Sequence, residues 1–102
     1  MLTKNLAVDL APDGIRVNGY CPAAVETNMV TRFVDAAPNP EALKSMMALS
    51  HLVPRLGAPE DVANLVCFLA SREASFINGV LWLIDGGSLA WRGTTDALGM
   101  EP

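Results

Sequence analysis

Two short apolar segments, 15–21 and 80–84, lie far apart in this chain, and the residues between them have helical rather than strand character. Side chains of segment 15–21 alternate between two faces, while segment 80–84 is an unbroken apolar run. Strands connected through helices pair in parallel by a right-handed crossover, because antiparallel neighbours need only a short turn. The two segments therefore predict a parallel α/β sheet. Pro22 lacks an N–H group, so we expect it to end the pairing of the first strand.

One helix is predicted before the first strand and three between the strands. Segment 2–11 carries leucines every four residues, which gives it one apolar stripe. Thr27 suits the cap of a helix over 28–35, and Asn39 the cap of the next helix, which has proline at its first position. The clearest helix begins at Pro59, with two acidic residues in its first turn, and is expected to end near 71–72.

Both predicted strands are apolar on two faces, whereas a sheet of two strands has no interior and needs further strands beside it. No capping residue precedes the helix that begins near Met1. These features predict that residues 1–91 are the C-terminal part of a larger parallel α/β domain. Residues 92–102 are small and polar, so we expect a loose C-terminal tail. The polar Asn18, in a strand-like position, is expected to be satisfied by neighbouring backbone groups.

The composition favours a soluble, cytoplasmic protein. Hydrophobic residues make up 51% of the chain, and its net charge of −4 argues against nucleic-acid and anionic-membrane partners. No apolar run is long enough to span a bilayer. Cys21 and Cys67 are expected to be buried free thiols. His51 is the only histidine, so no metal site is predicted, and we expect it on the surface or in a loop.

Several short motifs resemble the C-terminal third of the short-chain dehydrogenase/reductase family. They are Leu2–Ala7, Leu10–Asn18, Pro22 with Thr27, Arg55–Ala63, Phe68–Ser71 and Asp85–Gly87. Each is weak alone, but their order and spacing are specific. The resemblance implies a Rossmann-like, doubly wound parallel sheet, of which this chain supplies two strands and about four helices. It also implies an oxidoreductase that transfers hydride between NAD or NADP and a small carbonyl or alcohol substrate.

The loop after the first strand carries the cofactor residues that the resemblance implies. In the family this loop reads Pro-Gly-x-Ile/Val-x-Thr, and Pro22, Ala23, Ala24, Val25 and Thr27 lie in this loop here. The backbone of Val25 would pair with the nicotinamide carboxamide, and the Thr27 hydroxyl would bond the carboxamide or the pyrophosphate. Taken alone, Thr27 is an ordinary N-cap. Ala23 replaces the family's glycine, which would cost on the order of 1 kcal/mol if the backbone there needs a positive φ.

Four apolar residues lie in the segment that covers the substrate in this family. They are Met29, Phe33, Met46 and Met47. Soft side chains of this kind suit a mobile lid over an apolar substrate, and ordinary core packing is an equal alternative.

The family's catalytic residues are not found in this sequence. It has no glycine-rich turn after a first strand, and its single tyrosine, Tyr20, is followed four positions later by Ala24 rather than by lysine. We therefore predict no catalytic residue and no hydride transfer by this chain alone. Segment 80–84 and the helix from Pro59 resemble a subunit interface in the family, which implies a homo-oligomeric parent. The alternative hypothesis is a non-catalytic product that acts as an interaction or oligomerisation module.

Overall fold

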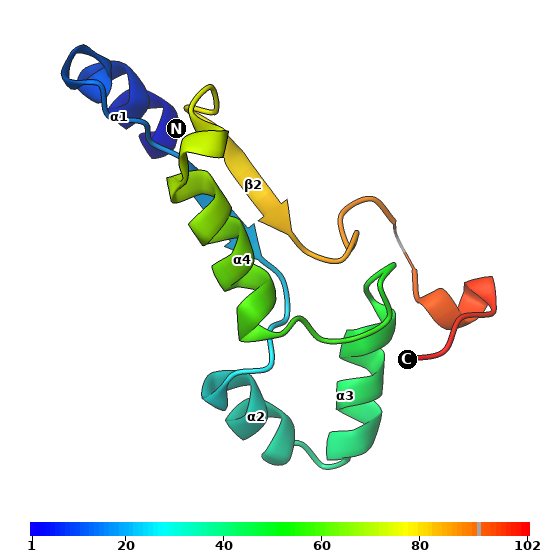
Figure 1. Ribbon diagram of the computed structural model, residues 1–102. Coiled ribbons are helices and arrows are strands. Elements are labelled where there is room, and N and C mark those ends of the chain that lie inside the picture. Colours follow the sequence, from blue (N-terminus) through cyan, green and yellow to red (C-terminus); the bar gives the residue numbers. More distant parts are fainter. Residues whose placement is uncertain (92) are drawn as a thin grey trace.

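A computed structural model describes residues 1–91 and 93–102, and it forms a two-stranded parallel sheet with helices before and between the strands (Figure 1). The strands are β1 (Gly19–Pro22) and β2 (Leu81–Ile84), and the helices are α1 (Leu2–Leu10), α2 (Asn28–Asp35), α3 (Pro40–Leu49) and α4 (Pro59–Ala70). Short 3-10 turns cover Ala11–Asp13, Arg72–Ala74 and Thr95–Leu98. The α/β class, the parallel pairing and the four helices are as the sequence predicts.

Strand β1 begins later than predicted, at Gly19 rather than in segment 15–18. Before Gly19, the side chain of Asn18 makes hydrogen bonds to the backbone where backbone–backbone bonds to the segment before β2 would otherwise form. Its Nδ2 donates to the carbonyl of Ile77 at 3.0 Å, and its Oδ1 accepts from the N–H of Val80 at 3.2 Å. The expectation that backbone groups satisfy Asn18 is confirmed, and these same bonds delay the regular ladder.

Strand β1 ends at Pro22, as predicted, but the missing N–H of the proline is not the cause. Pro22 lies opposite Ile84 as the last residue of β1. The N–H of Gly19 donates to the carbonyl of Val80 at 2.9 Å, and the N–H of Ala23 donates to that of Ile84 at 3.1 Å. Alternate residues of a strand point their N–H groups to opposite sides. The nitrogen of Pro22 therefore faces away from β2, where no donor is needed for this ladder.

Hydrogen bonds from Arg16 connect the C-terminal end of α4 to the segment that leads into β1. Its guanidinium donates to the carbonyls of Leu69 at 2.8 Å, Ser71 at 3.3 Å and Ile77 at 3.2 Å. The last carbonyls of a helix have no partner within the helix, and a cation there also complements the helix dipole. Figure 1 shows α4 lying across the two strands in the position that these bonds fix.

Helix α1 approaches the start of the sheet closely at Gly19. A Cβ atom on Gly19 would lie 2.7 Å from Cδ1 of Leu81 and 3.0 Å from Oγ1 of Thr3 in α1. The first distance is shorter than real Cβ contacts and the second is tight, so a larger residue at position 19 would require the side chain of Leu81 to shift.

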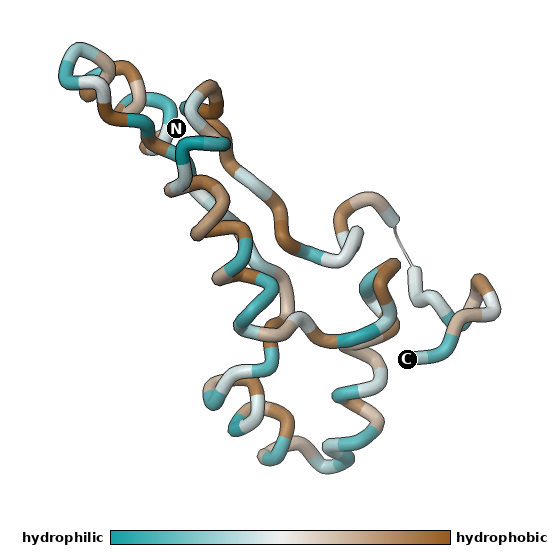
Figure 2. Tube along the Cα trace, viewed as in Figure 1, coloured by the Kyte–Doolittle hydropathy of each residue, from teal (hydrophilic) through white to brown (hydrophobic). Residues whose placement is uncertain are grey.

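The molecule is elongated, with extents of 52 × 29 × 24 Å. Its radius of gyration is 16.8 Å, whereas a compact domain of this length has about 13 Å. Figure 2 shows apolar residues distributed along the molecule, and the buried ones are mostly small: Ala7, Val34, Ala48, Leu56, Leu69 and Ala74. Leu81 and Leu83 of β2 are 57% and 55% exposed, so the expected burial of both sheet faces is not reached within this chain.

The C-terminal tail contacts α3 and is not loose throughout. Thr95 is fully buried, and its Oγ1 donates to the carbonyl of Leu49 at 3.1 Å. This hydroxyl binds a carbonyl at the end of α3, where the last carbonyls of a helix lack partners within the helix, and Thr95–Leu98 forms a 3-10 turn. The loose character of the tail as a whole stays a prediction. Residue 92 lies outside the described residues.

The two cysteines are free, as predicted, but Cys67 is exposed and Cys21 is only partly buried, so their predicted burial is wrong. Within 1–91 and 93–102, none of the helices has the length and apolar character that a membrane crossing requires.

We expect Arg16→Met to destabilise the fold by about 1.5–3 kcal/mol, because it leaves three carbonyls without a charged donor. Urea unfolding followed by circular dichroism measures the change. Arg32→Met on α2 is the matched control, since Arg32 makes no side-chain hydrogen bond to any described residue. Equal stability of the Arg16 and Arg32 variants would contradict this role.

Candidate functional site

A cavity of about 270 Å³ lies where the two strands end. Its wall comes from loop 23–25 after β1, loop 51–57 between α3 and α4, the first turn of α4, and residues 84–86 at the end of β2. In parallel α/β sheets, ligands bind in the crevice beyond the carboxyl ends of the strands. The cavity is therefore at the edge of the sheet where a ligand is expected.

Val25 beside this cavity keeps a free donor and a free acceptor in its backbone. It forms an isolated parallel bridge with Gly57, whose N–H donates to the carbonyl of Ala24 at 2.9 Å and whose carbonyl accepts from the N–H of Glu26 at 2.8 Å. These bonds use the neighbours of Val25, so its own N–H and C=O point to the opposite side. Neither group has a hydrogen-bond partner among the described residues.

Thr27 caps α2, as predicted. Its Oγ1 accepts from the N–H of Val30 at 3.4 Å, and α2 has the predicted bounds. The residue is exposed, and its O–H proton remains available as a donor. The cap is confirmed, while the contact of Thr27 with a cofactor stays a prediction.

Ala23 carries no strain from a positive φ. Every positive-φ residue in the described chain is a glycine, so the backbone at Ala23 lies in the ordinary region. Its N–H continues the ladder by donating to Ile84. The conditional cost of replacing the family's glycine therefore does not arise here.

Three of the four predicted lid residues are well exposed. Met29 is 79% exposed, Phe33 64% and Met46 56%, and only Met47 is partly buried. Core packing within this chain is therefore wrong for these three, while their role as a lid stays a prediction. An ion pair of 2.7 Å between Lys44 on α3 and Glu26 links the second lid helix to the loop after β1.

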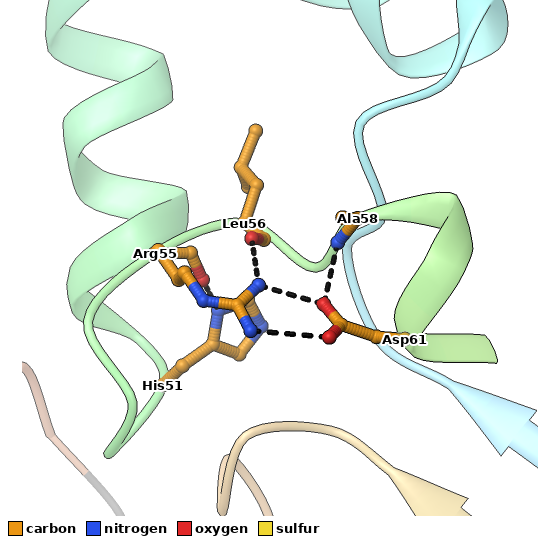
Figure 3. A network of polar contacts seen from close by, with 5 residues as sticks. All are labelled: His51, Arg55, Leu56, Ala58 and Asp61. Carbon is orange, nitrogen blue, oxygen red and sulfur yellow. Dashed lines mark hydrogen bonds and ion pairs between the residues drawn. The ribbon is translucent and has the colours of Figure 1, made fainter. Parts of the chain in front are cut away.

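A polar network sets the start of α4 and the end of loop 51–57 (Figure 3). Arg55 donates to both carboxylate oxygens of Asp61, at 2.7 and 3.2 Å, and to the carbonyl of Leu56 at 3.0 Å. Asp61 also accepts from the N–H of Ala58 at 2.7 Å. The hydrogen bonds from Arg55 and then from Ala58 lower the pKa of Asp61, and the Arg55 pKa is raised in return.

His51 is buried, so the expectation of a surface position is wrong, although it does lie in a loop. It is 3% exposed, and its Nδ1 lies 2.7 Å from the carbonyl of Arg55 (Figure 3). A Cβ on Gly86 would lie 3.1 Å from Cβ of His51, and the N–H of Val53 donates to the carbonyl of Gly86 at 2.9 Å. The turn after β2 therefore covers His51, and the local sequence around His51 carries no sign of this contact.

The family comparison matches most of the chain. Residues 1–88 match a family model described as enoyl-(acyl carrier protein) reductase. The short-chain dehydrogenase anuF of Penicillium roqueforti is 42% identical over 85% of this chain and 30% of its own length. Dehydrogenase/reductase SDR family member 4 of Sus scrofa is 45% identical over 85% of this chain and 30% of its own length. The chain thus spans about a third of the curated relatives that it matches.

Solved structures share the fold. The ligand-free aldohexose dehydrogenase of Thermoplasma acidophilum is 40% identical, with a TM-score of 0.81 over 89% of this chain and 37% of that one. A 4-hydroxyisoleucine dehydrogenase mutant complexed with NADH and succinate is 30% identical, with a TM-score of 0.79 over 90% and 36%. ElxO with NADP bound is 33% identical, with a TM-score of 0.75 over 88% and 35%.

We expect the stabilising effect of Asp61 to be lost in acid. Its folded-state pKa lies below the usual 3.8, so its contribution is present above that value and disappears as pH falls through the folded pKa. The midpoint of thermal unfolding of Asp61→Asn should lie below that of the wild type at about pH 7, and this gap should narrow steadily as the pH falls below 3.8. Glu60→Gln, in the same turn, is the control because it leaves the Arg55 pair intact. A gap that does not change with pH would contradict this account.

Proposed function

Because this chain belongs to the short-chain dehydrogenase/reductase family, we propose that it forms one wall of the nicotinamide site in an NAD- or NADP-dependent oxidoreductase. The substrate is a small carbonyl or alcohol compound, and the bound nicotinamide supplies the hydride chemistry. The observation that carries this proposal is the free N–H and C=O of Val25 at the carboxyl end of β1.

Val25 offers one donor and one acceptor side by side on the same edge of the chain. A carboxamide carries the complementary pair, a carbonyl oxygen and an NH₂ group. The backbone of Val25 thus fits the nicotinamide carboxamide and would orient the ring. Because the bridge to Gly57 holds Val25 in place, these two groups are fixed before a ligand arrives.

Thr27 supplies a second contact to the cofactor. Its oxygen is engaged in capping α2, so the hydroxyl proton is what it offers to a ligand, and an acceptor such as a carboxamide or phosphate oxygen fits it. The first N–H groups of α2 lie next to this hydroxyl and favour an anion in the same place. Pro22, Ala23 and Ala24 shape the loop, and we assign them to the same wall.

Helices α2 and α3 cover the substrate in this proposal. The exposed side chains of Met29, Phe33 and Met46 form an apolar surface that no other part of the described chain covers. Such side chains adapt to different apolar shapes, as a substrate lid requires. Met47 is more enclosed than these three residues, and we assign it to the same lid.

We place this chain in the C-terminal third of the family domain. The order of its motifs supports this placement, as do the apolar strand residues Leu81 and Leu83 that lack cover within the chain. The glycine-rich turn and the Tyr-x-x-x-Lys pair of the family are not in this sequence. We therefore assign the phosphate cradle and the acid–base groups to other parts of that domain.

A second candidate is a non-catalytic interaction or oligomerisation module. The exposed leucines of β2 favour it, because an uncovered apolar strand is a surface to which another chain can pair. Both candidates share this surface, and only the first requires the backbone of Val25.

A chimera separates the two candidates. Residues 1–88 would replace the matching segment of the Thermoplasma acidophilum aldohexose dehydrogenase, which shares 40% identity. The formation of reduced nicotinamide is measured by absorbance with an aldohexose as substrate. We expect an active chimera, and a Val25→Pro variant with roughly tenfold lower kcat/KM, because one hydrogen bond to the carboxamide is lost.

Val25→Ala is the matched control, since it keeps the N–H group, and it should lose far less activity than Val25→Pro. Circular dichroism must show that each chimera is folded. A folded chimera without turnover, or a Val25→Pro variant with unchanged kinetics, would refute the proposed wall.

The isolated chain should bind the cofactor weakly. The pyrophosphate contributes much of the affinity of a dinucleotide in this type of fold, and its glycine-rich cradle is not in this sequence. We expect micromolar chain to cause neither quenching nor a spectral shift of NADPH fluorescence. Saturable quenching in this range would show that the loop after β1 suffices for binding.

A further inference from the structure

His51 presents a hydrogen-bond acceptor from a buried position. The carbonyl of Arg55 can only accept, so the 2.7 Å contact requires a proton on Nδ1. In the neutral ring, Nε2 then carries a lone pair, and the tautomer is fixed by the backbone.

The second ring nitrogen, Nε2, is not fully enclosed by the described residues. Nε2 has no hydrogen-bond partner within 1–91 and 93–102. The fully buried side-chain nitrogens without a partner in these residues are the indole nitrogens of Trp82 and Trp91, and Nε2 is not one of them. His51 is almost fully buried, and it lines the cavity at the end of the strands. The cavity is therefore the space that Nε2 reaches.

The charges around this cavity argue against an anionic ligand. Among the described residues that line it, Arg55 is the one with a guanidinium or ammonium group, and both oxygens of Asp61 hold it. The carboxylate of Asp85 also lines the cavity and accepts from the N–H groups of Gly87 and Leu89. Within 1–91 and 93–102, an incoming phosphate or carboxylate would meet two engaged carboxylates and no unengaged lysine or arginine in the lining.

The remaining wall is apolar. Val25, Val53, Val62 and Ile84 line the cavity together with His51. A largely apolar wall, in which both carboxylates are already engaged and His51 adds an acceptor without a partner among the described residues, suits a compact aliphatic body with a single donor group. Its volume of about 270 Å³ admits only a small molecule.

We propose that this cavity binds a small neutral alcohol, whose hydroxyl donates to Nε2 of His51. This site uses the side of loop 23–25 that faces Gly57 and β2, whereas the free N–H and C=O of Val25 point the other way. The alcohol site therefore does not depend on a bound nicotinamide.

The single histidine makes a direct test possible. In ¹⁵N-labelled chain, two-bond ¹H–¹⁵N spectra report both ring nitrogens without further assignment, because only His51 contributes. We expect cyclopentanol to move the Nε2 resonance in a saturable manner and to move the Nδ1 resonance less. Cyclopentanone, which has nearly the same shape and no donor, should cause no comparable shift.

Two variants separate the acceptor from packing. His51→Asn can keep a donor near the place of Nδ1 and removes the acceptor. The Kd for cyclopentanol, from a saturation-transfer titration, should therefore rise roughly tenfold, as expected for one lost hydrogen bond. His51→Gln can place an amide oxygen near the position of Nε2 and should retain part of the binding.

Several results would overturn the proposal. They are a shift that does not saturate, an equal shift with cyclopentanone, unchanged binding by His51→Asn, or tighter binding of cyclopentylammonium, which would point to the carboxylates instead. If His51→Asn fails to fold, the comparison of cyclopentanol with cyclopentanone on the wild-type chain still decides.

Discussion

The parallel ladder between β1 and β2 is the constraint on which the rest of this structure depends. A parallel pair brings both carboxyl ends to the same edge, so the loop after β1 and the turn after β2 must meet there. The crossover of α2, α3 and α4 then returns past the same edge and contributes loop 51–57. Three segments that are distant in sequence thereby enclose one cavity, and the position of the cavity follows from the topology.

Local signals predicted the helices well. Thr27 and Asn39 place an acceptor directly before α2 and α3, and Pro59 can occupy only the first turn of α4, so these starts are encoded by neighbouring residues. The start of β1 was missed because Asn18 replaces ladder bonds through its contact with Ile77, a residue far along the chain. Helix ends depend on adjacent atoms, whereas strand ends depend on a partner that the local sequence does not contain.

In the candidate site too, some features were predictable from the sequence and others depend on residues that are distant in the chain. Resemblance to a family placed the loop after β1, but the direction in which Val25 points is set by its bridge to Gly57. His51 could not be recognised as buried, because Gly86 covers it from the turn after β2. The exposure of Met29 and Phe33 also follows from which elements lie beside α2, and periodicity alone gives equal support to a core or a lid.

The position of Val25 depends in turn on the start of α4. Asp61 holds the N–H of Ala58 and the guanidinium of Arg55, and Gly57 lies between these two residues. Gly57 then fixes both neighbours of Val25 through its N–H and C=O. A helix cap and one ion pair are therefore connected, through three short backbone segments, to the free N–H and C=O of Val25, the groups that we propose as the ligand contacts. The hydrogen bonds of Gly57 to Ala24 and Glu26 fix the backbone around Val25 from one side. The N–H and C=O of Val25 on the other side are therefore held in one orientation while they remain unbonded, as a preorganised binding edge requires.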